Sequence, residues 1–302
     1  MLTRAQFTSS ARAALCLALS LTACNHQKSS PTPAFPRLSP DVILRDVTFH
    51  SGALSRDMPY RVFLPASVAA GKKLPVIFLL HGGGGGFRDW SNYSDVARFA
   101  QRGVILVMPE GESSYYTNAA DRPQDRFEDY IANDLIAEVE QKFPAATGRA
   151  NRAIMGVSMG GFGAVNLALK HPDLFAFAAG ISSAIDVPSR PFSIKRIGQW
   201  RQHAAIFGPW KSEHRRGNDP FVLARSLDGA RAPYFYLTCG EQEGLLPANK
   251  QFAALLQQRH FASEFHPGPG GHNWNQWNGR LEGVFEALFA HLGPTLSASA
   301  LS

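Results

Sequence analysis

The sequence has few cysteines, only a small excess of charge of one sign and no long apolar runs. Only 3 cysteines occur in 302 residues, and two of them, Cys16 and Cys24, lie near the N-terminus. Cys239 therefore has no partner in the body of the chain, so a disulfide framework is excluded and the fold depends on its core. In the apolar segment PYFYLTC we interpret Cys239 as a buried, unreactive thiol.

The charge is modest and scattered. The net charge is +6, and removing the first 23 residues, which hold Arg4 and Arg12 and no acid, lowers it to +4. The lysines and arginines form no cluster, so the composition calls for no nucleic-acid partner. The length fits one large α/β domain with a short tail.

The N-terminus has the features of an export signal. Two arginines precede the apolar stretch AALCLALSL, which is too short to remain in a bilayer as a spanning helix. It ends in LTAC at residues 21–24, which resembles the lipobox of bacterial lipoproteins. We expect a lipoprotein signal peptide over 1–23, with an ordinary cleaved signal as the alternative, and a lipid anchor on Cys24. The predicted location is the cell envelope, with membrane association through that anchor, and a Pro/Ser-rich tether over 24–40 leads to the folded domain.

From about residue 41 onward, strand-like and helix-like segments alternate. The expected strands cover 43–51, 60–65, 75–81, 104–109, 153–157, 175–181, 234–239 and 263–267, and the expected helices 89–102, 126–142, 159–170, 247–259 and 277–291. Several strands are continuously apolar, as in a parallel sheet covered on both faces, whereas the first two alternate and predict an antiparallel edge. The pattern predicts a three-layer α/β domain over 41–292 and a tail over 293–302.

One segment, residues 183–232, interrupts this alternation. It contains no clear strand, and it carries VPSRPF, two tryptophans and the charged run KSEHRR. An insertion at this point either covers the functional site as a cap or is a surface elaboration. The sequence leaves both interpretations open.

The strongest local motif is GVSMGG at residues 156–161, between an apolar strand and a helical pattern. A G-x-S-x-G motif in this context forms a nucleophile elbow. Its outer positions need glycine because a side chain there would collide with neighbouring backbone. The serine lies at a helix N-terminus, where free N–H groups favour developing negative charge. We predict that Ser158 is a nucleophile.

Five glycines, residues 82–86, follow His81 directly after an apolar strand. A flexible linker does not fit that position, and a phosphate-binding loop would end in Gly-Lys-Ser/Thr, which is absent. Glycine lets the backbone approach a ligand and turn an N–H toward it. We therefore predict that this loop forms an oxyanion hole together with the N–H of Met159, and that His81 is structural.

A serine nucleophile needs an acid and a base, which follow it in the order acid, then histidine. His272 is favoured as the base because it lies in the glycine-containing loop GGHNW, where it is free to reach the serine. The acid is expected in GEQEG, directly after YFYLTC, where Glu243 is favoured over Glu241. The other histidines considered as the base lie in a strand or near helix ends: His260, His266 and His291.

The chain resembles the esterase family related to esterase D over about residues 43–290. The segments that carry the resemblance occur in this order: RVFLP, LPVIFLLHGGGGGFRDW, VMPEG, SSYYTN, GVSMGGFGAVNLALKHPDLF, NDPFVLA, TCGEQEG and GGHNWNQW. Members of that family include tributyrin esterases, S-formylglutathione hydrolases, feruloyl and acetylxylan esterases and the mycolyltransferases of the antigen 85 group. The resemblance implies an α/β-hydrolase fold and a serine esterase that needs no metal or cofactor.

The resemblance also implies roles for single residues. It places the first oxyanion donor on Gly83, and it places the acid at Glu243, where the family commonly has aspartate. It implies an acyl-enzyme mechanism on short-acyl or carbohydrate-linked esters, such as acetyl or feruloyl esters. The alternatives are an acyltransferase that uses a sugar or alcohol acceptor and an inactive binding protein with the same fold.

Aromatic residues in or near the loops expected at the rim of the site offer substrate contacts. We predict that Trp90, Tyr116 and Trp274 bind substrate; Tyr115 and Trp277 are further candidates. Each of these rings is equally compatible with a place in the core.

Overall fold

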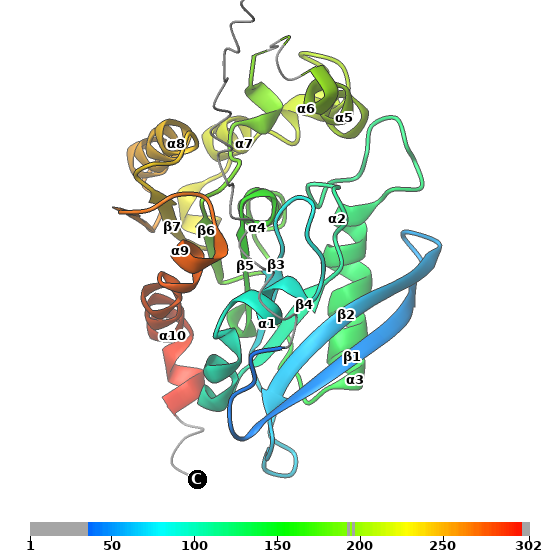
Figure 1. The fold of residues 1–302 in the computed structure, drawn as a ribbon, viewed down its shortest axis with the longest axis vertical. Coiled ribbons are helices and arrows are strands. Elements are labelled where there is room, and N and C mark those ends of the chain that lie inside the picture. The colour runs from blue at the N-terminus through cyan, green and yellow to red at the C-terminus, as the bar shows by residue number, and fades with distance from the viewer. Residues whose placement is uncertain (1–35, 192–193, 195–196, 298–302) are drawn as a thin grey trace, which may run out of the picture. The chain divides into compact units, whose positions relative to one another are not determined.

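One sheet of eight strands organises the structure, a computed structural model that describes residues 36–191, 194 and 197–297 (Figure 1). The strand order is β1-β2-β4-β3-β5-β6-β7-β8. β2 runs antiparallel to both β1 and β4, and the remaining neighbours are parallel. The strands are β1 (Val42–Ser51), β2 (Arg56–Pro65), β3 (Val76–Leu80), β4 (Ile105–Pro109), β5 (Arg152–Val157), β6 (Phe177–Ile181), β7 (Tyr234–Gly240) and β8 (Ser263–Gly268). The predicted antiparallel edge and mainly parallel α/β sheet are confirmed.

Helices cover both faces of this sheet. The α-helices are α1 (Asp89–Tyr93), α2 (Phe127–Asp129), α3 (Ile136–Lys142), α4 (Met159–Lys170), α5 (Ile197–Phe207), α6 (Glu213–Arg216), α7 (Pro220–Ser226), α8 (Leu246–Gln258), α9 (Trp274–Asn278) and α10 (Leu281–Ser297). The other helical turns are η1 (Val96–Arg102), η2 (Tyr130–Leu135), η3 (Arg149–Asn151), η4 (Val187–Ser189) and η6 (Gly229–Arg231).

The sequence of β3 shows why helices pack on both faces of the sheet. Val76, Phe78 and Leu80 pack into a core shared with α3, α4 and α8. Ile77 and Leu79 point the other way, into a core shared with α1, η1 and α10. Side chains alternate across a strand, so a strand with both faces covered must be apolar at every position.

The helix expected over 89–102 is interrupted, which corrects that prediction. α1 ends at Tyr93, and a 3-10 helix begins at Val96. Ser94 ends the first helix: it is extended, with φ −135°, and both its N–H and its hydroxyl donate to the carbonyl of Trp90. A serine that bonds to the backbone in this way competes with helix continuation.

The insertion at 183–232 folds into short helices that are joined by a buried arginine. Figure 1 shows α5, α6 and α7 grouped together, apart from the β1–β2 hairpin. The guanidinium of Arg215, a residue only 5% exposed, lies among them. It donates to the carbonyl oxygens of Pro188, His203, Gly208 and Pro209. One side chain thus connects η4, α5 and the start of α6.

The predicted signal peptide, Cys24, most of the predicted tether and residues 298–302 of the predicted tail lie outside the described residues. The first part of that tail is helical, because α10 continues to Ser297. Within the part of the chain that the structure describes, no helix combines the length and the apolar character that a membrane span requires.

Candidate active site

Ser158 lies in a strained turn between β5 and α4. Its φ is +56°, a left-handed conformation that costs a non-glycine residue about 1–3 kcal/mol. A Cβ on Gly156 would lie 2.3 Å from the backbone of Gly160, and a Cβ on Gly160 would lie 2.2 Å from the carbonyl oxygen of Leu80. Only glycine fits at these two positions, which are the outer positions of the motif.

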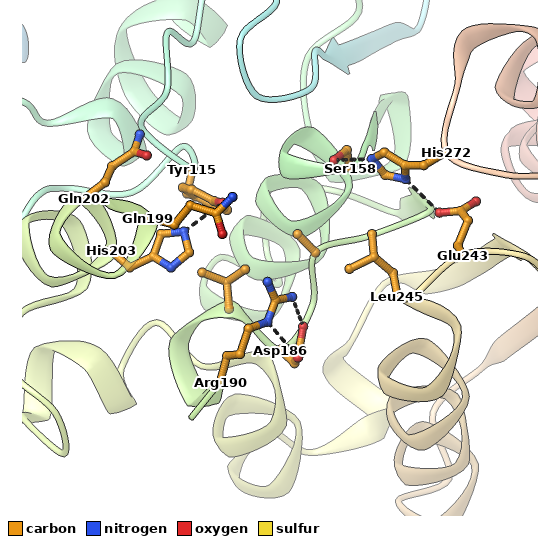
Figure 2. Close-up of a pocket in the computed structure, with 13 residues that line it drawn as sticks. Tyr115, Ser158, Asp186, Arg190, Gln199, Gln202, His203, Glu243, Leu245 and His272 are labelled. Atoms are coloured by element: carbon orange, nitrogen blue, oxygen red, sulfur yellow. Dashed lines mark hydrogen bonds and ion pairs between the residues drawn. The ribbon is translucent and has the colours of Figure 1, made fainter. Parts of the chain in front are cut away.

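Ser158, His272 and Glu243 form one hydrogen-bonded row (Figure 2). His272 Nε2 lies 2.8 Å from Ser158 Oγ, and His272 Nδ1 lies 2.7 Å from Glu243 Oε2. An ionised carboxylate can only accept, so Nδ1 carries the proton and Nε2 is free to accept the serine hydroxyl hydrogen. The structure thus brings together the three residues that the sequence assigned to nucleophile, acid and base.

Glu243 is buried, and three donors surround its carboxylate. Besides His272, the hydroxyl of Ser182 (2.6 Å) and the N–H of Gly240 (2.8 Å) donate to it. Burial alone would raise the pKa of Glu243, but these hydrogen bonds outweigh burial and hold the pKa below its ordinary value. The indole N–H of Trp277 in turn donates to Ser182 Oγ at 3.1 Å. Trp277, a candidate for substrate contact in the sequence, is buried and supports the acid instead, and Ser182 is a supporting residue that no sequence motif marks.

The second-choice residues have other surroundings. Glu241 and His260 are exposed. His266 pairs with Glu264 at 2.7 Å, and His291 packs against a tyrosine ring. None of these side chains takes part in the hydrogen-bonded row described above.

The loop after β3 reaches the N-terminus of α4. A Cβ on Gly83 would lie 3.8 Å from the Cβ of Met159, so the two residues are neighbours. Neither the N–H of Gly83 nor that of Met159 has a hydrogen-bond acceptor among the described residues. Two free N–H groups beside a nucleophile can stabilise an oxyanion.

His81 orients this loop. Its Nδ1 donates to the carbonyl of Gly82 at 2.8 Å, and the N–H of Gly85 donates to the same carbonyl at 3.1 Å. The C=O and N–H of a trans peptide point in opposite directions. Fixing the Gly82 carbonyl therefore also fixes the direction of the Gly83 N–H.

Tyr116 supports the same loop through a buried hydrogen bond. This corrects the prediction that Tyr116 binds substrate. It is fully buried, and its hydroxyl donates to the carbonyl of His81 at 3.1 Å. Its ring fits between two glycines: a Cβ on Gly111 or Gly163 would lie 2.2 or 2.5 Å from it. No surface of Tyr116 remains for a substrate.

Trp90 is also not placed to bind substrate, contrary to the sequence prediction, whereas Trp274 keeps part of its surface exposed. Trp90 is 1% exposed, and its indole N–H donates to the carbonyl of Leu80. Trp274 is half-buried and packs edge-on against Trp90 and Trp277, with ring centroids 5.3 and 5.2 Å apart. Among the described residues, the cavity beside Ser158 is lined by Tyr115 and by neither of these two tryptophans.

That cavity, of about 570 Å³, lies between the hydrogen-bonded row and the insertion (Figure 2). The insertion supplies much of its wall, so its side chains border the site. They include the ion pair of Asp186 with Arg190 and the imidazole of His203, which lies 3.1 Å from the hydroxyl of Tyr115. Sequence reasoning named none of the three, and no motif marks them. In the part of the chain that the structure describes, no group of three or more His, Cys, Asp or Glu side chains is arranged to hold a metal ion.

A serine at a strained strand–helix turn of a mainly parallel sheet, bonded to a histidine that a buried carboxylate orients, defines a serine hydrolase of the α/β-hydrolase class. The comparison with known families agrees with this. The chain belongs to the esterase family whose model, described as "Putative esterase", matches residues 51–288.

Two relatives share about a quarter of the sequence. An acetyl esterase of Caldicellulosiruptor saccharolyticus is 24% identical over 258 residues, which cover 80% of this chain and 97% of that protein. Esterase Rv1288 of Mycobacterium tuberculosis is 25% identical over 278 residues, which cover 82% of this chain and 59% of that protein.

Solved structures confirm the predicted α/β-hydrolase fold. A ferulic acid esterase superimposes with a TM-score of 0.71 at 25% identity, covering 84% of this chain and 99% of that structure. FphF, a fluorophosphonate-binding serine hydrolase of Staphylococcus aureus, gives a TM-score of 0.71 at 24% identity, covering 83% and 99%.

The role of Tyr116 can be tested by removing one oxygen atom. In Tyr116→Phe, the carbonyl of His81 loses a donor and the loop loosens, so we expect kcat to fall roughly tenfold with little change in KM; deleting an oxyanion donor itself costs about 10²–10³. Tyr60→Phe is the matched control, because Tyr60 is equally buried and donates to Glu138, away from Ser158. Both variants should lose about 1 kcal/mol of stability. An equal fall in kcat in both would contradict the assignment.

Glu243→Gln tests the acid. We expect kcat to fall on the order of 10⁴-fold, because an amide no longer orients and stabilises the protonated histidine, whereas Glu241→Gln should remain active. The pKa of Glu243 lies below the ordinary value of 4.5, so its ionised form stabilises the folded protein above that pH, and this contribution is lost as pH falls through the folded-state pKa. The difference in free energy of unfolding between wild type and Glu243→Gln should therefore shrink in acid. Equal activity of Glu243→Gln and Glu241→Gln would rule out Glu243 as the acid.

Proposed function

We propose that the chain is a carboxylic-ester hydrolase that works through an acyl-enzyme on Ser158. The hydrogen-bonded row of Ser158, His272 and Glu243 carries the proposal. The free N–H groups of Gly83 and Met159 beside it support an oxyanion hole.

The proposed reaction has two halves. His272 Nε2 takes the proton of Ser158 as Oγ attacks the ester carbonyl, and the N–H groups of Gly83 and Met159 stabilise the oxyanion. The C–O bond to the alcohol breaks, and His272 gives its proton to the departing oxygen. A water molecule, deprotonated by His272, then attacks the acyl-enzyme and releases the acid and the free serine. Glu243 stays ionised and stabilises the imidazolium in both halves.

Hydrolysis is favoured over acyl transfer because water can reach the base. The side chain of His272 is 39% exposed, and it lies at the edge of an open cavity. An acyltransferase with the same three residues must keep water away from its acyl-enzyme, which this exposure does not favour.

The proposed substrates are short-acyl or carbohydrate-linked esters, such as acetyl or feruloyl esters. A cavity of about 570 Å³ is far larger than an acetyl group needs and lies within the usual range for small-molecule sites. The names of two similar proteins, an acetyl esterase and a ferulic acid esterase, are in line with this substrate range.

Ser158→Ala tests the nucleophile. Turnover of p-nitrophenyl acetate should fall by at least about 10³-fold, and labelling by a fluorophosphonate probe should be lost, because the attacking oxygen is gone. Ser226→Ala, an exposed serine on α7, is the matched control and should react normally. Undiminished turnover in Ser158→Ala would refute the proposal.

A second experiment separates hydrolysis from acyl transfer. When glycerol is added to the wild-type enzyme with p-nitrophenyl acetate, acetate should remain the main product. Acetylglycerol in its place would identify an acyltransferase.

We also propose that the protein is exported and anchored in the cell envelope by lipid on Cys24. The support is in the sequence: two early arginines, a short apolar stretch and the LTAC segment that ends at Cys24. A Pro- and Ser-rich segment after the anchor would let the esterase domain stand away from the membrane.

Cys24→Ala tests the anchor. In a bacterial host that expresses the full chain, we expect the wild type in the membrane fraction, carrying metabolically incorporated fatty acid. The variant should lose the label, because the acceptor thiol is missing. Cys16→Ala is the matched control and should retain it. A wild-type chain without label would disprove the anchor and leave the esterase assignment untouched.

A further inference from the structure

A second cavity adjoins the catalytic one. Its volume is about 470 Å³, and it shares Asp186, Arg190 and Gly244 with the cavity beside Ser158. We call it the distal cavity; its other lining residues include Asp219, Phe221, Arg225 and Pro247. Since both cavities are lined by the Asp186–Arg190 ion pair, a substrate that overfills the first cavity would meet this pair and then the distal cavity.

The Asp186–Arg190 ion pair leaves several N–H donors of Arg190 available to a ligand. Arg190 donates from Nε at 3.1 Å and from Nη2 at 2.5 Å to the two oxygens of Asp186, in a bidentate arrangement. A guanidinium has five N–H groups, and the other three have no acceptor among the described residues. The side chains of Arg190 and Asp186 are 22% and 29% exposed, so both keep polar surface for a ligand.

The part of the wall that the insertion supplies around this pair is polar but has no net charge. Asp186 balances Arg190, and Gln199 and Gln202 are neutral. Burial, together with the positive charges of Arg190 and Arg215, lowers the pKa of His203 to about 4, so its imidazole is uncharged at neutral pH. Such a wall offers donors and acceptors to hydroxyl groups without favouring a carboxylate or an ammonium group.

The distal cavity also combines acidic and basic side chains, and it adds apolar surface. Asp219 and Arg225 contribute one acid and one base, while Phe221 and Pro247 contribute apolar surface. A sugar ring presents hydroxyl groups at its edge and C–H groups on its face. Polar groups beside an aromatic or prolyl surface are therefore suited to a pyranose unit.

We propose that the distal cavity is a second substrate subsite, and that the Asp186–Arg190 pair binds hydroxyl groups of a substrate whose alcohol part is a neutral oligosaccharide spanning both cavities. This inference rests on the proposed esterase function. It assigns the cavities to the alcohol part of the ester, and it makes chain length, rather than acyl group alone, a determinant of specificity.

A length series tests the inference. The substrates are an acetylated methyl xyloside, an acetylated xylotriose and an acetylated trigalacturonate, with p-nitrophenyl acetate as a reference that needs no sugar subsite. We expect kcat/KM to be at least about tenfold higher for the neutral trimer than for the monomer, and higher than for the anionic trimer. Arg190→Ala and Arg225→Ala should bring the trimer-to-monomer ratio close to one. In Arg190→Lys, which keeps the charge but loses the bidentate fork, the ratio should also fall.

Arg231→Ala is the matched control, because Arg231 is an exposed arginine paired with Asp173 and lines neither cavity as described. It should keep the wild-type ratio. Binding of unacetylated xylotriose to Ser158→Ala, measured by calorimetry, gives a readout that needs no turnover, and we expect it to weaken when Arg190→Ala is added.

Two outcomes would overturn the subsite: a wild-type ratio near one, or a high ratio that survives Arg190→Ala in a variant that unfolds at the wild-type temperature. Preference for the anionic trimer would overturn the neutral class. Failure of the esterase proposal looks different, because p-nitrophenyl acetate and all sugar esters would then be inert.

Discussion

The close contact of three backbone segments underlies the site. Gly160 in the first turn of α4 lies against the carbonyl of Leu80, at the end of β3, and against Gly156 at the end of β5. That contact forces Ser158 into its left-handed conformation. It also brings the loop that follows β3 alongside Met159. The nucleophile and the oxyanion donors thus owe their positions to Gly156 and Gly160, whose lack of a Cβ allows this close contact.

Much of this arrangement is predictable because it depends on backbone geometry. Glycine spacing around Ser158 and the glycine run after His81 are visible in the sequence. Chain order then favours His272 as the base and limits the acid to Glu241 or Glu243, and the resemblance to the family places it at Glu243. The direction of an aromatic side chain leaves no such trace, so the sequence alone does not reveal that Trp90 and Tyr116 belong to the core. The residues of the cavity wall, such as Asp186 and Arg190, follow no motif, because only the folding of the insertion brings them to the site.

Glutamate at position 243, where the resemblance implies that aspartate is common, is accommodated by its surroundings. A Cβ on Gly240 would lie 2.5 Å from Glu243 Oε1, so the glycine makes room for the longer side chain. Ser182 and Gly240 then hold one carboxylate oxygen, which leaves the other for His272. Trp277, which donates to Ser182, extends this support to α9. The extra methylene group therefore does not make the carboxylate less well fixed.

The single thiol of the folded domain has a practical consequence. Cys239 is fully buried in β7, and burial, together with the nearby charge of Glu243, raises the pKa of its thiol to about 12. Since the thiolate is the reactive form, almost none is present at neutral pH. The domain can therefore mature in an oxidising compartment without a disulfide isomerase, and it can be purified and stored in air without reducing agent.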